Sequence, residues 1–534
     1  MHPALRSHRP LIMGRRGAVA TNHPVATQAG LDVLRAGGNA VDATIAVSLA
    51  LGVVEPHMSG LGGDGFFQLH LAGGEGVCVN ATGAAPRAAT PVAYAAGIPV
   101  EGPRSTSTPG LLAGLALLHE RHGTLPWARL VAPAEEAARD GFAATHHYRH
   151  FAGENLGKLR PSPGSAARLL ADGAPPALGA LVVQPELAET LAEIARGGAE
   201  GFYRGALAQR LAAGIAADGG PVAAADLAAC TAEAQPPIAV PFCGFEVRQT
   251  PPNSTGFAFL QMLRILDRFD LAALDLDGAG LIHLMVEAKK LAFLDRERWG
   301  ADPRGLDIPL DRLLSEGHAA ELAARIDPRR AAALPVREDA TGDTTYFCVV
   351  DAAGNAVSAI QSLNSAFGSG VTAGDTGVLL NNRMAYWHLQ PGHPNRLAPG
   401  MRVRHTMNAP MVFKDGALWG VFGTPGADNQ VQVNLQVMVA MAVFGLDPQQ
   451  AVEMPRWTSS QPGQGANYPH GGDSTLTLER GLGAAAPALE AMGHRVKVVG
   501  PLEGPCSVEA IRVLPNGVRM AGSDPRRDGW AGAC

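Results

Sequence analysis

A change of pattern near residue 342 constrains the fold of this 534-residue chain more than any other feature. Before it, apolar residues recur mainly with helical spacing; after it, short runs alternate between apolar and polar residues with the period of a strand. We therefore expect an α+β protein in which helices and strands pack as separate layers. Helices are predicted over residues 27–54, with a hinge at Gly37 and Gly38, and over residues 111–122, 133–140, 185–196, 206–217 and 280–298.

The part after residue 342 is predicted to be rich in strands. The strand-like runs are YFCVV, AVSAIQSL, GVLLNN, PMVFKDGALWGVFG and AIRVLPNGVRM. Two of them contain the dipeptides Asp-Gly (415–416) and Asn-Gly (516–517), which are typical of two-residue hairpin turns. One long helix is expected over residues 429–444, with Asp428 as its N-cap.

Length, charge and cysteine content narrow the class of protein. A chain of 534 residues exceeds one ordinary core, so two to four domains or one large interwoven unit are expected. The net charge of −6, without a long basic run, favours a small-molecule substrate over nucleic acid or an anionic membrane surface. The N-terminus lacks a secretory apolar region, and no window of about 18 apolar residues follows, so a cytoplasmic protein is predicted. The six cysteines form no C-x-x-C pair, and reduced thiols are the simplest interpretation, although disulfides stay open.

Two motifs suggest ligand sites that their contexts do not support. The run G-x-G-x-x-G at residues 60–65 should follow a strand and open a helix if it bound a dinucleotide, whereas here a helix precedes it and the strand FFQLHL follows. A tight turn with close backbone packing is the better interpretation. His146, His147 and His150 could share a helix face, but without acidic or cysteine partners nearby a solvated face is favoured over zinc. Neither a metal nor a cofactor is predicted.

A pair of threonines, Thr344 and Thr345, opens the run GDTTYFCVVDAAGNAVS, which alternates, turns at residues 353–355 and alternates again. Such a pair is ordinary at the start of a strand, because β-branched residues favour strands. A second interpretation is that one of the two becomes a new N-terminus after the chain is cut. A threonine hydroxyl needs a base, and a free α-amino group that titrates near pH ~8 can serve as that base. Residue types alone leave both interpretations open.

Blocks spread over nearly the whole chain resemble the γ-glutamyltransferase family, and they occur in the family's order. They are GAVATNHPVATQAGLDVLRAGGNAVDATIAVSLALGVVEPHMSGLGGDGFF, QTPPNSTGFAFLQMLRIL, HLMVEAKKLAFLDRERWGADP, GDTTYFCVVDAAGNAVSAIQSLNSAFGSG, LLNNRM, GTPGADNQVQ and SDPRRDG.

The resemblance implies an N-terminal-nucleophile hydrolase with a four-layer αββα sandwich, made as a proenzyme that cleaves itself. The cut maps between Asp343 and Thr344, which gives a large, mostly helical chain (1–343) and a small, β-rich chain (344–534) within one interwoven fold. Thr344 is chosen over Thr345 because Asp351 follows it by seven residues, the spacing that the family shows. The two chains are expected to form a heterodimer, and a dimer of heterodimers is left open.

The resemblance also implies catalytic roles. Thr344 is the nucleophile and its own α-amine the base, and water or an acceptor amine resolves the acyl-enzyme. Gly426 and Ala427 take the positions whose backbone N–H groups stabilise the oxyanion, with Ala427 in place of the family's second glycine. Ser362 stands where the family has a threonine that supports the amine, and Asn364 matches an asparagine of the substrate pocket. The alternative for both is an ordinary polar strand position.

Five positions of the substrate pocket depart from the family's pattern. Thr82 replaces an arginine that binds the substrate carboxylate, and Tyr386 replaces an aspartate that meets its amine. Arg383 takes a glutamine or glutamate position, and His405 and Thr406 replace a serine pair. An ammonium buried without a counter-charge is costly, so the expected acyl group carries a carboxylate and no α-amine, as in oxamate or a glutaryl amide. Arg383 is its predicted anchor, and a structural ion pair is an equal alternative.

The predicted function is hydrolysis of a small amide by a relative of oxamate amidohydrolase and the cephalosporin acylases that release a glutaryl side chain. The connection between LLNN and His405 is shorter than the family's lid-bearing loop, which favours hydrolysis over transfer. One alternative is a true γ-glutamyl hydrolase or transferase that acts on glutathione-like substrates. Another is an unprocessed, inactive binding protein, against which the intact Thr344, Ser362 and Asn364 argue.

Overall fold

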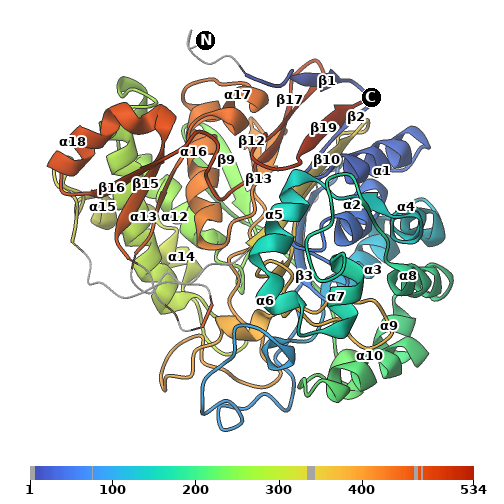
Figure 1. The fold of residues 1–534 in the computed structure, drawn as a ribbon. Coiled ribbons are helices and arrows are strands. Elements are labelled where there is room, and N and C mark those ends of the chain that lie inside the picture. The colour runs from blue at the N-terminus through green and yellow to red at the C-terminus, as the bar shows by residue number, and fades with distance from the viewer. Residues whose placement is uncertain (1–6, 75, 334–342, 462–466, 469, 471–472) are drawn as a thin grey trace.

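Two stacked seven-stranded sheets form the centre of the protein in a computed structural model that describes residues 7–74, 76–333, 343–461, 467, 468, 470 and 473–534 (Figure 1). Neighbouring strands in both sheets are antiparallel. The first sheet has the order β1 (Ile12–Gly14), β18 (Arg519–Ser523), β17 (Glu509–Val513), β13 (Ala417–Gly423), β12 (Met411–Lys414), β9 (Phe245–Gln249), β8 (Ile238–Phe242). The second has the order β19 (Trp530–Ala533), β2 (Gly17–Thr21), β10 (Asp343–Asp351), β11 (Ala356–Asn364), β3 (Asp64–His70), β4 (Gly76–Ala81), β7 (Glu233–Gln235).

Helices cover the outer face of each sheet, so that the layers follow the order αββα (Figure 1). On the side of the second sheet lie α1 (Pro24–Arg35), α2 (Ala40–Val54), α3 (Leu111–His122), α4 (Trp127–Asp140), α5 (His146–Glu154), α6 (Leu156–Leu159), α7 (Pro163–Leu169), α8 (Pro185–Gly197), α9 (Glu200–Arg204), α10 (Ala206–Ala217) and α11 (Ala224–Ala228). On the side of the first lie α12 (Gly256–Leu266), α13 (Ala279–Trp299), α14 (Leu310–Leu313), α15 (Glu316–Ala323), α16 (Gln430–Ala442), α17 (Pro448–Glu453) and α18 (Ala486–Ala491). Smaller sheets join β14 (Trp457–Ser459), β15 (Thr475–Glu479) and β16 (Arg495–Val499), and β5 (Phe142–Ala143) and β6 (Leu181–Val182).

The central strand β10 shows why the chain forms these layers. Successive side chains of a strand point to opposite faces. Tyr346, Cys348 and Val350 are buried between the two sheets, whereas Phe347 and Val349 are buried against the helices. Both faces of β10 are therefore apolar, as a strand covered on both sides requires. Both sheets combine strands from before and after residue 343.

The layered α+β fold predicted from the sequence is confirmed, while three local predictions were wrong. The helix predicted from residue 133 begins at Trp127, because burial of Leu130 and Val131 outweighs the lost hydrogen bond at Pro133. The helix predicted from residue 429 begins at Gln430, and Asp428 is not its N-cap because its carboxylate pairs with Arg296.

The run GVLLNN is not a strand. Leu379 and Leu380 make only isolated bridges, with Thr372 and Gly62. The asparagines that follow bond backbone groups of distant loops with their side chains, for example Asn381 Nδ2 to Gly62 O at 2.7 Å. The run is thereby held as a loop against the start of β3.

Two findings bear on the environment of the protein. Across the described residues, none of the helices has the length and apolar character that crossing a bilayer would require. All six cysteines are free thiols, three of them buried.

Candidate active site

Thr344 lies at the start of β10, where the pairing with β11 shifts register. Asp343 is opposite Asn364 and Thr345 is opposite Gln361, so Thr344 alone faces two residues of β11. This is a β-bulge, a feature that re-aims side chains and is over-represented next to active sites. Thr344 is only 3% exposed. The side chain of Asp343, on the other side of the predicted cleavage point, lies outside the described part of the structure.

The neighbouring Thr345 has a hydroxyl that is used within the fold. It donates to Glu55 Oε2 (2.8 Å) and accepts from Asn22 Nδ2 (3.2 Å). These buried contacts tie β10 to the C-terminal end of α2 and to the segment after β2. The assignment of the nucleophile to Thr344 stays a prediction, and the engagement of Thr345 with a carboxylate is consistent with it.

A series of buried amides reaches the Thr344 hydroxyl from α16. Gln430 Nε2 donates to Thr344 Oγ1 at 3.4 Å. Asn408 Nδ2 donates to Gln430 Oε1 (3.1 Å), and Gln249 Nε2 donates to Asn408 Oδ1 (2.8 Å). Because an amide oxygen only accepts and its nitrogen only donates, this order presents a donor to the threonine. Gln430 was not among the residues predicted from the sequence, where its signal was its place directly after the GTPGADN turn.

Ser362 and Asn364 lie on β11 beside Thr344. Ser362 Oγ accepts from the backbone N–H of Asn364 (2.7 Å). Asn364 has a φ of +88°, a left-handed conformation that asparagine tolerates better than most residues. Its Nδ2 donates to Asn382 O (3.1 Å) and to Asn467 Oδ1 (2.9 Å), so its orientation is fixed. The catalytic role of Ser362 and the binding role of Asn364 stay predictions.

Gly426 and Ala427 form a tight turn that leads into α16. Their φ angles are +124° and +48°, and a Cβ on Gly426 would lie 2.4 Å from Cys506 Sγ, so only glycine fits there. Ala427 begins a short 3₁₀ turn (Ala427–Asn429). Within the described part of the chain, the backbone N–H groups of Gly426 and Ala427 have no acceptor. Two unused donors before a helix are the arrangement that an oxyanion site requires.

Five of the six side chains predicted to bind substrate lie together, namely those of Arg383, Asn364, Tyr386, His405 and Thr406. Arg383 Nη1 donates to Asn364 Oδ1 (3.3 Å), and its guanidinium lies 4.7 Å from the centre of the Tyr386 ring. The hydroxyls of Tyr386 and Thr406 are 3.1 Å apart, and the His405 ring meets that of Tyr386 edge-on. All five are buried. We call these residues, with Asp64, the Arg383 cluster.

Asp64 is the residue of this cluster that the sequence analysis missed. Its Oδ2 accepts from Arg383 Nε (3.1 Å) and its Oδ1 from the backbone N–H of Gly83 (2.9 Å). A Cβ on Gly63 would lie 2.4 Å from the backbone oxygen of Ser362. The glycine-rich run therefore packs closely against β11, as predicted, and this packing brings Asp64 to Arg383. The signal in the sequence was an aspartate inside that run.

Burial within the Arg383 cluster disfavours the charged forms of Asp64 and His405. Burial raises the pKa of Asp64, although the Arg383 guanidinium opposes this effect. Burial lowers the pKa of His405 well below its usual value, and Arg383 adds to this effect, so the ring is neutral at pH 7. Among the described residues, Arg383 Nη2 and both ring nitrogens of His405 have no hydrogen-bond partner, and His405 Nε2 is 3.6 Å from Asp64 Oδ2, too far for one. A buried donor without an acceptor costs about 1–3 kcal/mol, so the cluster is suited to an anionic ligand.

Thr82 is not brought into this cluster. Its hydroxyl donates to Asn80 Oδ1 (2.7 Å) and accepts from Asn253 Nδ2 (3.3 Å). These contacts hold the end of β4 to the loop before α12. No hydrogen bond of Thr82 to the cluster is found within the described residues, and its predicted binding role gains no support from the geometry.

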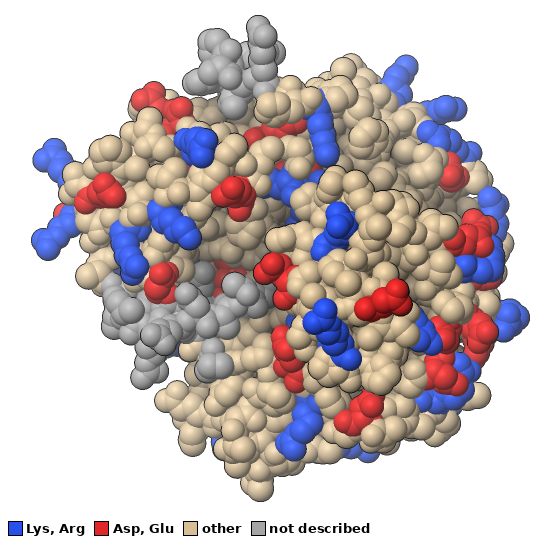
Figure 2. All heavy atoms as spheres, viewed as in Figure 1, with Lys and Arg blue, Asp and Glu red and all other residues tan. Residues whose placement is uncertain are grey.

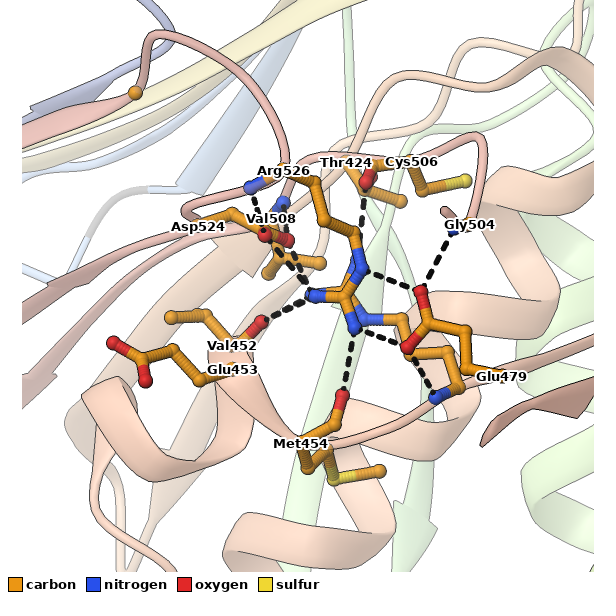
Figure 3. Close-up of polar contacts among 12 residues, drawn as sticks. Thr424, Val452, Glu453, Met454, Glu479, Gly504, Cys506, Val508, Asp524 and Arg526 are labelled. Carbon is orange, nitrogen blue, oxygen red and sulfur yellow. Dashed lines mark hydrogen bonds and ion pairs between the residues drawn. The ribbon is translucent and has the colours of Figure 1, made fainter. Parts of the chain in front are cut away.

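Arg527, from the SDPRRDG block, holds the backbone of Thr344. Its Nη1 donates to Thr344 O (3.3 Å) and its Nη2 to Pro505 O (3.1 Å). The adjacent Arg526 anchors the block inside the protein, where it is enclosed by Glu479, Asp524 and backbone carbonyls (Figure 3). This block was recognised in the sequence as part of the family resemblance, but neither arginine was assigned a role there.

Two groups of side chains have the composition of a metal site. In one, His283 Nε2 donates to Asp327 O (2.8 Å), which leaves Nδ1 to accept from His494 Nε2 (2.8 Å). The lone pairs are therefore engaged in the fold. In the other, His393 Nδ1 accepts from a backbone N–H, so the neutral ring carries its proton on Nε2, and Glu297 is paired with two arginines. In each of these groups of described residues, at least one ring nitrogen that a cation would need is engaged in the fold.

Comparisons with known proteins agree with this geometry. A sequence model of the family described as Gamma-glutamyltranspeptidase matches residues 26–534. The chain is 37% identical to the glutathione hydrolase-like YwrD proenzyme of Bacillus subtilis, over 97% of this chain and 99% of that protein. It is 36% identical to the oxamate amidohydrolase proenzyme of Klebsiella pneumoniae, over 96% and 98% respectively.

The fold comparison points the same way. The structure of a cephalosporin acylase from Bacillus halodurans superposes with a TM-score of 0.90 and 32% identity, covering 100% of this chain and 98% of that one. The matches in sequence and fold extend over nearly the whole length of both partners. The chain therefore belongs to the gamma-glutamyltranspeptidase family and is an amide-hydrolysing enzyme of that family.

Proposed function

We propose that the protein is a self-cleaving N-terminal-threonine hydrolase that acts on small amides whose acyl group carries a carboxylate, such as oxamate or a glutaryl amide. In the precursor, Thr344 Oγ attacks the carbonyl carbon of Asp343, and the C–N bond between the two residues breaks, which frees the α-amine of Thr344 and leaves an ester. Water then hydrolyses this ester, which restores the Thr344 hydroxyl and separates the two chains. The mature enzyme then consists of residues 1–343 and 344–534. The names of the relatives, which are proenzymes, support this step.

In the proposed catalytic cycle, the freed α-amine takes the proton of Thr344 Oγ as the oxygen attacks the substrate carbonyl. The N–H groups of Gly426 and Ala427 stabilise the oxyanion. The C–N bond then breaks, the proton passes to the leaving nitrogen, and an ester on Thr344 remains. Water, activated by the same amine, attacks this ester and releases the acid.

The observation that carries the choice of acyl group is that Arg383 Nη2 finds no hydrogen-bond partner among the residues that the structure describes. Asp64 neutralises the charge of Arg383 through Nε but leaves this nitrogen available to a second carboxylate. Substrate carboxylates are commonly bound by arginine in this way. The α-ammonium of a γ-glutamyl group would need an acidic partner, which the family has at the position of Tyr386. Here the Tyr386 and Thr406 hydroxyls, which are neutral, contact each other instead. A carboxylate without an α-amine is therefore the better fit.

The first experiment tests processing. Purified protein should run as two fragments on a denaturing gel, and Edman sequencing of the smaller one should begin at Thr344. The Thr344→Ala variant should run as one chain and have no activity. A single band from active wild-type protein would refute the self-cleaving mechanism, and a single band from an inactive wild type would favour a binding protein.

The second experiment tests the acyl group. Release of ammonia or amine is compared for oxamate, a glutaryl amide and a γ-glutamyl amide in the wild type and in Arg383→Gln. We expect the first two to be preferred, and their kcat/KM to fall about 10- to 100-fold in the variant, as for loss of one charged hydrogen bond. Preference for the γ-glutamyl amide, unaffected by the variant, would instead indicate a glutathione-type hydrolase or transferase.

A further inference from the structure

A cavity of about 790 Å³ lies beside Thr344 and has no role in the chemistry described above. One side is formed by α5 and α6, and the other by residues 502–505 and Arg527. The wall also includes Val100, Glu101, Ser365, Ala366, Asn467 and Arg526. The surface is hollowed next to the region that α5 occupies in Figure 1, as Figure 2 shows.

Three contacts connect this cavity to the site. Arg527 lines it and donates to Thr344 O (3.3 Å). Asn467 lines it and accepts from Asn364 Nδ2 (2.9 Å). Gly504 and Pro505 line it, and they lead directly to Cys506, whose sulfur contacts Gly426. Residues of the cavity wall, or the neighbouring Cys506, thus contact the predicted nucleophile, the asparagine predicted to bind substrate and the predicted oxyanion turn. Among the described residues of its wall, none belongs to the Arg383 cluster.

We propose that this cavity binds the amine half of the substrate, and that the enzyme prefers amides of a bulky, largely apolar amine over primary amides. The inference rests on the proposed function and extends it to the other half of the scissile bond. The acyl half occupies the buried Arg383 cluster, and the nitrogen of the amide points into the cavity.

Size is the first argument. Cavities of about 300–1,000 Å³ are typical of sites for drug-sized ligands. Ammonia, the leaving group of oxamate, is similar in size to water, whose share of liquid volume is about 30 Å³. A primary amide would therefore leave almost the whole cavity filled with water and gain no binding energy from it. A larger amine would displace that water from the wall.

The chemistry of the wall is the second argument. Phe151 of α5 faces the cavity, with the His57 ring stacked against it at 4.9 Å and the Arg527 guanidinium 5.4 Å from its centre. The lysine and arginines of the wall are already paired within the protein. Lys158 is committed to Glu101 (3.5 Å) and to Ala366 O (2.7 Å), Arg527 to the backbone oxygens of Thr344 and Pro505, and Arg526 to Glu479 and Asp524. The ring therefore offers a fixed aromatic surface, against which a flat or apolar group packs favourably.

The cavity also suits the order of steps. After the bond from Thr344 Oγ to the carbonyl carbon has formed, the oxyanion intermediate collapses, the C–N bond breaks and the leaving nitrogen takes up the proton held by the α-amine. The free amine leaves through the cavity, and water reaches the ester by the same opening. No further reactant is needed.

The test uses two substrates with the same acyl group, glutaramic acid and its N-benzyl derivative. Ammonia and benzylamine have similar basicity, so the intrinsic difficulty of C–N cleavage is similar. Burial of the benzyl group should raise kcat/KM at least about tenfold over the primary amide. In Phe151→Ala, which removes the aromatic surface, and in Ala366→Leu, which narrows the cavity without removing a packed ring, this ratio should fall toward one. His146→Ala, at an exposed position of α5 outside the cavity wall, should keep the wild-type ratio.

Two results would overturn the inference. Equal kcat/KM for the two substrates in the wild type would do so, and so would a ratio unchanged in both cavity variants. Failure of the proposed function is recognised separately. If the proposed function is wrong, N-benzylpentanamide, which lacks the terminal carboxylate, would be hydrolysed as fast as the N-benzyl glutaryl compound. Alternatively, neither glutaryl amide would be turned over. This last outcome would also remove the basis of the present inference.

Discussion

Arg383 and Arg526 are both buried arginines paired with a buried aspartate, yet their surroundings differ. Arg526 uses all three nitrogens: Nε and Nη2 bind Glu479, Nη1 binds Asp524 (3.1 Å), and backbone carbonyls take the remaining protons (Figure 3). Arg383 binds Asp64 through Nε and Asn364 through Nη1, and leaves Nη2 without a partner in the described structure. The first arrangement is complete without a ligand, and the second is not.

Asp64 and Asp524, the aspartates paired with Arg383 and Arg526, differ in the direction of their pKa shifts. Burial opposes ionisation of Asp524, but the guanidinium groups of Arg456 and Arg526 outweigh it and hold its pKa below the usual range. Burial raises the pKa of Asp64, because the single guanidinium of Arg383 does not compensate for it. A buried ion pair that satisfies all its groups serves the fold, whereas one with an unused donor is suited to binding.

The largest expected effect comes from removing the guanidinium of Arg526, which pairs with Glu479 and Asp524. Arg526→Met leaves Glu479 and Asp524 buried with one guanidinium fewer, and should lower the free energy of unfolding by about 3–5 kcal/mol. Urea denaturation measures this loss. Arg480→Met, at an exposed position nearby, is the matched control and should be near neutral. A loss below about 1 kcal/mol for Arg526→Met would show that this pair is not what holds the SDPRRDG block.

The second prediction concerns binding of a carboxylate ligand to Arg383. In the inactive Thr344→Ala protein, glutarate at 100 times its dissociation constant should stabilise the fold by about 2.7 kcal/mol, because it binds only the native state. The shift in thermal unfolding should be absent when Arg383→Met is added. An equal shift in the double variant would place the bound carboxylate elsewhere.

The third prediction uses pH to separate the two aspartates. A lowered pKa gives Asp524 a contribution to stability that is present above the unfolded value of 3.8 and lost as pH falls through the folded value. The deficit of Asp524→Asn relative to wild type should therefore shrink in acid. A raised pKa gives Asp64 the opposite sign, so Asp64→Asn should gain on the wild type as pH rises above 3.8. Each pKa unit corresponds to about 1.4 kcal/mol in urea denaturation series. Slopes of the same sign for the two variants would contradict the comparison.

The smallest expected effect tests the same distinction with two glutamines of α16. Gln436 binds backbone groups of Trp457 on both sides of its amide, whereas Gln430 donates to Thr344 Oγ1. Gln430→Leu should lower kcat about three- to tenfold, as for one neutral hydrogen bond, and leave KM unchanged. Gln436→Leu should lower stability and keep kcat. A reversed pattern in steady-state kinetics would show that Gln430 only supports packing.

Apolar periodicity and turn motifs correctly predicted the helices and hairpins that depend on residues close together in sequence. Periodicity gave both ends of α3 and α10, and the Asp-Gly turn at 415–416 lies between β12 and β13 as expected. Asp428 has the right chemistry for an N-cap, but a tertiary ion pair with Arg296, 132 residues away in sequence, takes its carboxylate. Contacts of that kind leave no periodic signal.

The candidate site shows the same limit. Of the substrate-binding residues predicted from family resemblance, all but Thr82 are brought together in the Arg383 cluster. Asp64 was missed because it meets Arg383 across 319 residues of sequence, and Gln430 because its role depends on which way an amide is turned by Asn408. Charge pairing and hydrogen-bond direction are properties of the assembled fold.

The mixed origin of the strands has a mechanical consequence for a chain cut before residue 344. In the second sheet, β10 and β11 are bordered by β2 and β3, and in the first, β12 is bordered by β9. Hydrogen bonds along these borders would survive the loss of one peptide bond, and each complete sheet would still need strands from both fragments. Scission would thus create two chain ends near the centre of the molecule, and separating the two fragments would require breaking the hydrogen bonds between their paired strands.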